Sequence, residues 1–278
     1  MASSDLSAET GVLNIAGFEI GYYWWGDRTA LPIVAFTDFG EAPGWFAPVA
    51  EKLTEAGYSM MSFSLPAHRA QGISEPEFID PNSFADALAQ TLHYNEITRC
   101  ILLAGGFGSR IALPLAVRHL PLIQRLWLIS PDGFNPRIDR IAAFLSVNPA
   151  ARLLQKSDRL AGFIVDHIAP GHQKQYRSVM IGALRKWLAS RQLLDFYQNG
   201  TLARLYHIDC PVELIWGKED SINPYYLAGE VRQHFRNVRV HPLEEGGRNV
   251  LSSQPERLAA ELISLPGRPA TSSSRLRW

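Results

Sequence analysis

The sequence has little cysteine, no net charge and no long apolar run. Only two of its 278 residues are cysteines, Cys100 and Cys210, too few for a disulfide framework and without the spacing of a metal site. Its 27 basic residues balance its 27 acidic ones, so no overall charge attracts nucleic acid or an anionic membrane. No stretch approaches the roughly 18 apolar residues of a membrane span, and the first residues lack a secretory signal. These absences predict a cytoplasmic protein with no metal, cofactor, nucleic-acid partner or membrane partner.

What is present is the pattern of a globular α/β protein, with 46% hydrophobic and 19% charged residues. Short apolar runs of strand length alternate with segments of helical periodicity, which predicts a mostly parallel eight-stranded sheet with flanking helices. An antiparallel hairpin is expected at 12–25. The other predicted strands are 32–36, 58–65, 100–103, 126–129, 212–216 and 238–242, and the main predicted helices are 45–56, 84–92, 111–119, 225–235 and 256–263.

One segment interrupts the alternation, because residues 132–207 read as helical throughout. We therefore expect a core made of 11–131 and 208–266, with 132–207 as a helical lid and flexible tails at 1–10 and 267–278. The lid segment holds 11 Arg or Lys and five Asp, a net charge of 11 − 5 = +6. This charge indicates either an anionic ligand or partner, or a solvated helical surface.

Five short motifs follow one another along the chain. They are Thr37-Asp38-Phe39-Gly40-Glu41, Leu65-Pro66-Ala67-His68-Arg69, Leu103-Ala104-Gly105-Gly106-Phe107-Gly108-Ser109, Trp216-Gly217-Lys218-Glu219-Asp220 and Gly246-Gly247-Arg248 with the following Gln254-Pro255-Glu256. With its motifs in this order, the chain from about Ile20 to Pro266 resembles the α/β-hydrolases. The resemblance implies the α/β-hydrolase fold. It also implies a nucleophile on a strained turn between a strand and a helix, followed along the chain by an acid and a histidine.

Two of these three positions depart from the family. The nucleophile turn needs small residues two before and two after its tip, and Gly105 and Ser109 flank Phe107 in this way. We therefore expect Phe107 in the nucleophile position with a positive φ angle, and Ser109 as a packing residue. Asp220 matches the acid, whereas Arg248 occupies the histidine position.

Arginine stays protonated and cannot accept a proton, so Arg248 cannot act as a general base. We expect it to form an ion pair with Asp220. Alternative bases on the insertion are His167 and His172. The backbone N–H groups of Gly108 and Phe39 match the oxyanion hole, but Asp38 replaces a glycine beside it and opposes an anion there.

These residues predict a protein without Ser-His-Asp hydrolase chemistry. In the leading interpretation, a pocket beneath the lid, formed by Asp38, Phe39, Phe107, Gly108 and Arg248, binds a small molecule, for which an anion is one option, or a protein partner. The alternative is an enzyme of another mechanism on the same fold: a lyase, isomerase, cyclase or hydrolase that uses the same pocket. A purely structural subunit is a third class.

Overall fold

The structure is a computed structural model that describes residues 8–38, 42–64, 81–136, 140, 156–168, 181, 201–248 and 250–265. Its strands are β1 (Glu9–Ile15), β2 (Phe18–Trp25), β3 (Leu31–Phe36), β4 (Tyr58–Phe63), β5 (Cys100–Gly105), β6 (Ile123–Ile129), β7 (Val212–Gly217) and β8 (Val238–Leu243). The α-helices are α1 (Ala47–Glu55), α2 (Pro81–Tyr94), α3 (Ser109–Arg118), α6 (Asp158–Ile168), α8 (Leu227–Arg232), α9 (Val250–Ser253) and α10 (Pro255–Ser264). Short 3-10 turns are η1 (Pro43–Phe46), η2 (Gly106–Gly108), η3 (Leu120–Leu122) and η5 (Thr201–His207).

All eight strands form one sheet in the order β1-β2-β4-β3-β5-β6-β7-β8. β1 pairs with β2, and β2 with β4, in antiparallel register, while β3 to β8 are parallel to one another. The predicted hairpin and the predicted mostly parallel sheet are therefore confirmed. The central strands β4, β5 and β7 are buried along their whole length, as is typical of parallel strands with helices on both faces.

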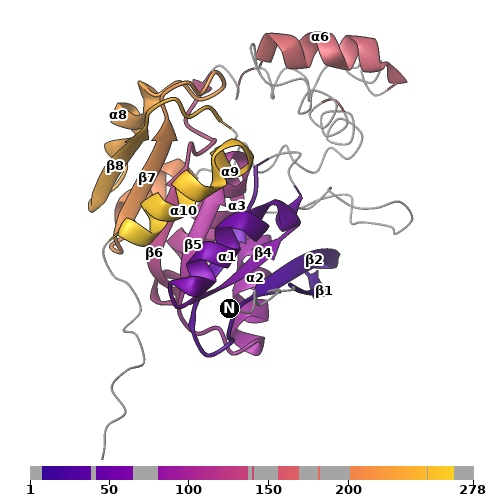
Figure 1. Ribbon diagram of the computed structural model, residues 1–278, viewed down its shortest axis with the longest axis vertical. Helices are drawn as coiled ribbons and strands as arrows, with labels where there is room; N and C mark the ends of the chain where they lie inside the picture. The colour runs from indigo at the N-terminus through magenta and orange to yellow at the C-terminus, as the bar shows by residue number, and fades with distance from the viewer. Residues whose placement is uncertain are drawn as a thin grey trace, which may run out of the picture.

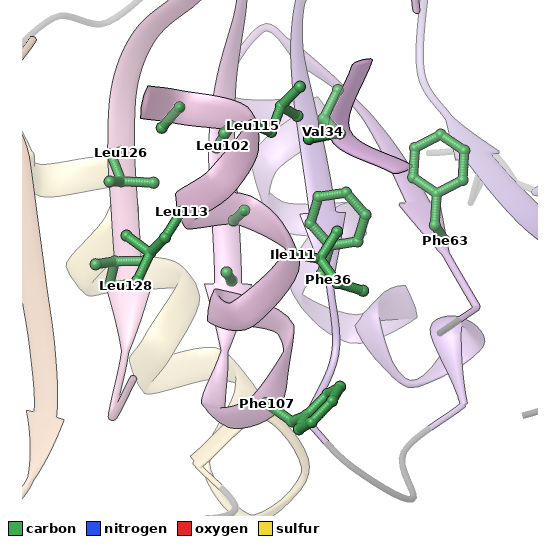
Figure 2. Close-up of a cluster of buried hydrophobic side chains, with 14 of the residues drawn as sticks. Val34, Phe36, Phe63, Leu102, Phe107, Ile111, Leu113, Leu115, Leu126 and Leu128 are labelled. Atoms are coloured by element: carbon green, nitrogen blue, oxygen red, sulfur yellow. The ribbon is translucent and has the colours of Figure 1, made fainter. Parts of the chain in front are cut away.

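Helices cover both faces of the sheet (Figure 1). On one face α2, α3 and α8 bury an apolar cluster that contains Leu88, Ile111 and Val231. Figure 2 shows how α3 lies across β3 and β5 in this cluster. On the other face α1 and α10 bury a second cluster that contains Leu53 and Leu258. Because the two clusters cover both faces of the sheet, we expect a binding or catalytic site at the ends of the strands.

The strand order reverses between β3 and β5. After β3 the chain crosses to β4 on one side, and after β4 it returns to β5 on the other side of β3. Helices that leave neighbouring strands in opposite directions open a crevice at the carboxyl ends of these strands, where ligands bind in open α/β sheets. The topology therefore predicts that the residues directly after β3 and β5 line this crevice.

The insertion between β6 and β7 is described in part. Its described portion includes α6 and η5, and in that portion there is no strand. Ala161 and Val165 of α6 are buried, and Phe163 is exposed. Residues 137–139, 141–155, 169–180 and 182–200 lie outside the described residues, as do both termini beyond 8 and 265. The lid and the tails therefore remain predictions. No helix in the described ranges is long and apolar enough to cross a membrane.

Candidate functional site

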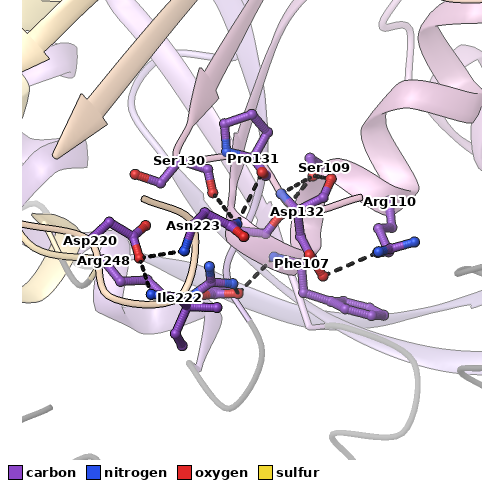
Figure 3. A network of polar contacts seen from close by, with 12 residues as sticks. Phe107, Ser109, Arg110, Ser130, Pro131, Asp132, Asp220, Ile222, Asn223 and Arg248 are labelled. Carbon is purple, nitrogen blue, oxygen red and sulfur yellow. Dashed lines mark hydrogen bonds and ion pairs between the residues drawn. The ribbon is translucent and has the colours of Figure 1, made fainter. Parts of the chain in front are cut away.

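Charged side chains gather at the carboxyl ends of the parallel strands. Asp38 follows β3, Asp132 follows β6, Asp220 follows β7, and Arg248 lies in the loop after β8. Relative exposures of 7%, 3% and 3% show that the three aspartates are buried. Figure 3 shows Asp132, Asp220 and Arg248 near Phe107 and Ser109, which belong to the turn between β5 and α3. The site predicted from the sequence is thus assembled from residues more than 200 positions apart, such as Asp38 and Arg248.

The turn between β5 and α3 has its left-handed residue at Gly106. Gly105 is extended, with φ −95°, and Gly106 has φ +41°. Phe107 is not among the described non-glycine residues with positive φ, which are Ala16, Glu96, Ser130 and Glu245. The expectation of a positive φ at Phe107 was therefore wrong. A glycine adopts the left-handed conformation without the steric cost of a Cβ, and Gly106 takes it one residue earlier.

The carboxylate of Asp38 lies against this turn. The Phe107 N–H donates to Asp38 Oδ1 at 2.7 Å. A Cβ built on Gly106 would lie only 2.1 Å from the same oxygen, well inside van der Waals contact. Asp38 therefore occupies the space into which a side chain at residue 106 would extend, and it accepts the hydrogen bond of the next backbone N–H.

Arg248 forms its ion pair with Asp38. Its Nε donates to Asp38 Oδ2 at 2.5 Å and its Nη2 donates to Oδ1 at 2.9 Å, the two-pronged geometry of a guanidinium on a carboxylate. The predicted Asp220–Arg248 ion pair was wrong, since no salt bridge joins these two described side chains. Although burial lowers the pKa of Arg248, the carboxylates of Asp38, Asp220 and Asp132 outweigh it and raise that pKa above its ordinary value. Arg248 is thus a permanent cation.

Asp220 binds the backbone of its own loop. Its Oδ1 accepts the N–H groups of Ile222 and Asn223 at 2.8 and 2.9 Å, which explains why this oxygen does not turn towards Arg248. Its Oδ2 is buried and has no hydrogen-bond partner among the described residues. Burial raises the pKa of Asp220, and the charge of Arg248 and the two backbone N–H groups offset this only in part.

Asp132 and Arg110 form a second buried ion pair that the sequence reasoning missed. Arg110 Nε lies 3.1 Å from Asp132 Oδ2, and both side chains are about 5% exposed, at 6% and 5%. Although burial acts to raise the pKa of Asp132, Arg110 and Arg248 lower it below its usual value. This pair could have been predicted from the sequence, because a charged residue stands just after β6 and another in the first turn of α3, two positions that the fold buries.

Ser109 and Gly108 have structural positions in the turn. Ser109 Oγ lies 2.7 Å from the carbonyl oxygen of Gly106 and 3.0 Å from that of Asp132, and the side chain is fully buried, in line with the predicted packing role. A Cβ on Gly108 would lie 2.6 Å from the carbonyl oxygen of Phe36, so α3 approaches β3 closely there. The N–H that points at the site belongs to Phe107.

The remaining predicted site residues are placed as follows. Phe107 is 1% exposed and belongs to the apolar cluster beneath α3. Phe39 and His172 lie outside the described residues, and of His167 only the backbone, in α6, is described. In the described ranges, no group of three or more His, Cys, Asp or Glu side chains is arranged to hold a metal ion.

Comparisons with known proteins agree with this architecture. A family model described as the alpha/beta hydrolase family matches residues 38–261. No curated protein matches significantly. Solved structures with similar folds include Cfl2 from Burkholderia cenocepacia, which is 21% identical, covers 94% of this chain and 96% of that one, and has a TM-score of 0.72.

Two further structures have similar scores. A thermophilic esterase from Thermogutta terrifontis is 15% identical, with coverage of 92% of this chain and 97% of that chain and a TM-score of 0.73. A putative lipase from Acinetobacter baumannii is 17% identical, with coverage of 93% and 90% and a TM-score of 0.72. Identities this low show a common fold and leave the chemistry to the residues of the site.

Proposed function

Because the chain belongs to the alpha/beta hydrolase family, we propose that it is a non-hydrolytic member that binds a small molecule at the carboxyl edge of its sheet. In this proposal, the nucleophile position holds a glycine, and an ion pair between Asp38 and the arginine in the histidine position lies beside it. Three features of the site support it: the residue at the strained turn, the carboxylate beside that turn, and the cation in the place of the base.

The first feature concerns the nucleophile position, which we now assign to Gly106 in place of Phe107. Positive φ is the mark of the strained turn, and Gly106 has it. The small residues Ala104 and Gly108 lie two before and two after Gly106, as the turn requires. Glycine has no side chain, so no nucleophilic atom stands at the tip of the turn.

The second feature is the observation that carries the proposal. Asp38 places a carboxylate where a nucleophile side chain would begin, and it occupies the Phe107 N–H that would stabilise an oxyanion. A tetrahedral intermediate carries negative charge on its oxygen, and the fixed carboxylate would repel it. Asp38 therefore opposes both the attack of a nucleophile on a substrate carbonyl and the stabilisation of the oxyanion that this attack forms.

The third feature is Arg248, which we assign to the histidine position. A general base needs a pKa near the working pH, whereas the pKa of Arg248 is raised further by the surrounding carboxylates. Its guanidinium instead donates two hydrogen bonds to Asp38, which hold this carboxylate ionised and in place beside the turn. The base of the triad has thus been replaced by a group that fixes the charge of Asp38.

One observation favours a second candidate, an enzyme of another mechanism such as a lyase or isomerase. Asp220 has an oxygen without a partner, and burial raises its pKa, two properties of a carboxyl group that moves a proton. If Asp220 is catalytic, Asp220→Asn should abolish turnover of the relevant substrate, and the pH profile of the wild-type protein should follow this carboxyl group.

The test of the leading proposal compares the wild-type protein with a rebuilt triad. We expect no labelling of the wild type by a fluorophosphonate probe and no hydrolysis of p-nitrophenyl acetate above background. Gly106→Ser alone should also be inactive, because Asp38 occupies the space of the new side chain and no base activates it. The triple variant Gly106→Ser, Asp38→Gly, Arg248→His restores a nucleophile, the open N–H and a base beside Asp220, and it should gain measurable hydrolysis.

Stoichiometric labelling of the wild type at any serine would contradict the proposal. Phe107→Ser is the matched control for the position: it should stay inactive in the Asp38→Gly, Arg248→His background, where Gly106→Ser gains activity. The reverse ranking would show that Phe107 stands in the nucleophile position.

A further inference from the structure

The two edge strands of the sheet, β1 and β8, differ in how they resist pairing with a further strand (Figure 1). On β8, Pro242 has no N–H to donate and Arg239 adds an exposed charge, two features that protect sheet edges from other chains. β1 contains no proline, lysine or arginine, and its register with β2 runs from Glu9 to Ile15 without a bulge. β1 is therefore an unprotected edge.

The hydrogen bonds of β2 show which backbone groups of β1 face outwards. The Gly21 N–H donates to Ser64 Oγ at 2.9 Å, and the Gly21 carbonyl oxygen accepts the Ser64 N–H at 2.8 Å, so the backbone of Gly21 faces the β4 side. Gly21 is the register partner of Val12, and the two therefore form a pair without mutual backbone hydrogen bonds. The N–H and carbonyl groups of Val12 point away from β2. Those of Thr10 and Asn14 do the same, because the direction alternates along an antiparallel strand.

The outward side of β1 carries an apolar side chain as well as open backbone groups. In the described part of the chain, β2 is the only strand beside β1, and no turn or loop hydrogen bond reaches the outward groups. Thr10, Val12 and Asn14 share one exposed face of the strand, and Val12 is 64% exposed. An added strand would pair the open N–H and carbonyl groups and would cover part of Val12.

The sequence of β1 is complementary to a second copy of itself. In an antiparallel pair about a two-fold axis at Val12, each Val12 faces Val12 of the second copy, and each Thr10 faces Asn14 of the second copy. Because all three residues have outward N–H and carbonyl groups, each of these pairs exchanges two backbone hydrogen bonds. Glu9, the only charged residue of β1, then lies opposite Ile15 of the second copy, so no like charges meet.

We propose that β1 is the interface between two copies of this chain, which join their sheets edge to edge into one continuous sheet. The two strands pair in antiparallel fashion with the two-fold axis at Val12. One pair of strands buries less surface than a standard protein interface, so the dimer is weak and depends on concentration. In the sheet, β2 and β4 separate β1 from β3, and the inference is independent of the function proposed for the carboxyl edge.

The first experiment is sedimentation velocity of the full-length protein from low to high micromolar concentration. We expect the wild type to shift from monomer to dimer over this range. Val12→Lys places like charges directly opposite each other at the axis and should weaken the association about tenfold or more. Val12→Glu should do the same, whereas Val12→Thr keeps a β-branched side chain and should dimerise like the wild type. Tyr94→Lys, at a position 88% exposed on α2, is the control for an added surface charge and should change nothing.

The second experiment tests the register by cross-linking under mild oxidation. Val12→Cys should give a covalent dimer, because the Cα atoms of a hydrogen-bonded antiparallel pair are about 5.5 Å apart, within the range of a disulfide. Thr10→Cys is the matched control: its two copies lie four positions apart along the paired strands, roughly 13 Å, and should not cross-link. Both variants retain Cys100 and Cys210, so the wild type gives the background.

Three results would overturn the inference: a wild type that stays monomeric at every concentration, a dimer that survives both Val12→Lys and Val12→Glu, and equal cross-linking through residues 10 and 12. Melting curves establish that each variant is folded, as we expect for substitutions at exposed positions of an edge strand. A dimer that is lost in the two charged variants and cross-links only through residue 12 would establish both the interface and its register.

Discussion

Asp132 and Asp220 are two carboxylates in equivalent places with opposite properties. Each follows a parallel strand at the carboxyl edge of the sheet, and each is 3% exposed. Asp132 has Arg110 on one oxygen and the Gly133 N–H on the other, at 3.1 and 2.8 Å, and its pKa is lowered. Asp220 has backbone N–H groups on one oxygen only, and its pKa is raised.

The difference shows that burial alone does not decide whether the pKa of a carboxyl group is raised or lowered. Both groups lose the same hydration, which raises the pKa of each. For Asp132 a cation in direct contact outweighs this loss, whereas for Asp220 the cation Arg248 is bound to Asp38 instead. Both oxygens of Asp132 are therefore hydrogen-bonded, whereas Asp220 Oδ2 has no hydrogen-bond partner among the described residues.

The largest effect should follow from removal of Arg110. Arg110→Met leaves Asp132 buried without its countercharge, and we expect a loss of about 3–5 kcal/mol of unfolding free energy. Urea denaturation at pH 7 measures it. The control is Arg118→Met, on the same helix, whose ion pair with Asp86 is about one-third exposed at 31% and 36% and should contribute at most about 1 kcal/mol. Equal losses in the two variants would show that the Arg110–Asp132 pair is not buried as described.

A smaller effect should follow from Ser109→Ala, which removes the hydroxyl between the Gly106 turn and the Asp132 loop. The Asp132 N–H also donates to the Gly106 carbonyl oxygen at 3.0 Å and keeps that bond in the variant. We therefore expect a loss of about 1 kcal/mol by urea denaturation. A loss as large as that of Arg110→Met would mean that the serine, and not the ion pair, organises Asp132.

The smallest effect at neutral pH should be that of Asp220→Asn. The amide keeps the acceptor for Ile222 and Asn223 and removes a buried charge, so the unfolding free energy at pH 7 should change by less than about 1 kcal/mol, in either direction. A loss of several kcal/mol would show that Asp220 is a structural anion like Asp132.

Lowering the pH should change the contributions of the two aspartates to the unfolding free energy in opposite directions. Because the pKa of Asp220 is raised, its proton contributes stability below the unfolded value of about 3.9 that is lost as the pH rises through the folded value. The wild type should therefore gain stability relative to Asp220→Asn as the pH falls from 7 towards 4. Because the pKa of Asp132 is lowered, its contribution is lost only below about pH 4. Urea curves at several pH values measure both, and parallel profiles would contradict the assignment.

Much of the fold was predictable because it depends on periodic patterns. The apolar runs predicted β3 to β8 to within a few residues, and the alternation with helices predicted a parallel sheet. The order of the motifs predicted that Asp38, the Gly106 turn, Asp220 and Arg248 belong to one site. The positive φ angle was expected at Phe107 and is found at Gly106, because the small-residue pattern fits the sequence in two registers, one around each of these residues.

By itself the sequence determined the order of the elements, the residues of the central strands and the presence of a permanent cation at position 248, since these depend on local pattern and residue identity. Only the tertiary structure decided which carboxylate binds Arg248. Asp38 and Asp220 are 210 and 28 residues from it along the chain, and the nearer one is not the partner. Asp220 accepts hydrogen bonds from backbone N–H groups of its own loop, whereas Asp38 lies against the turn because β3 and β5 are neighbours in the sheet. Hydrogen-bond geometry of this kind cannot be predicted from spacing along a chain.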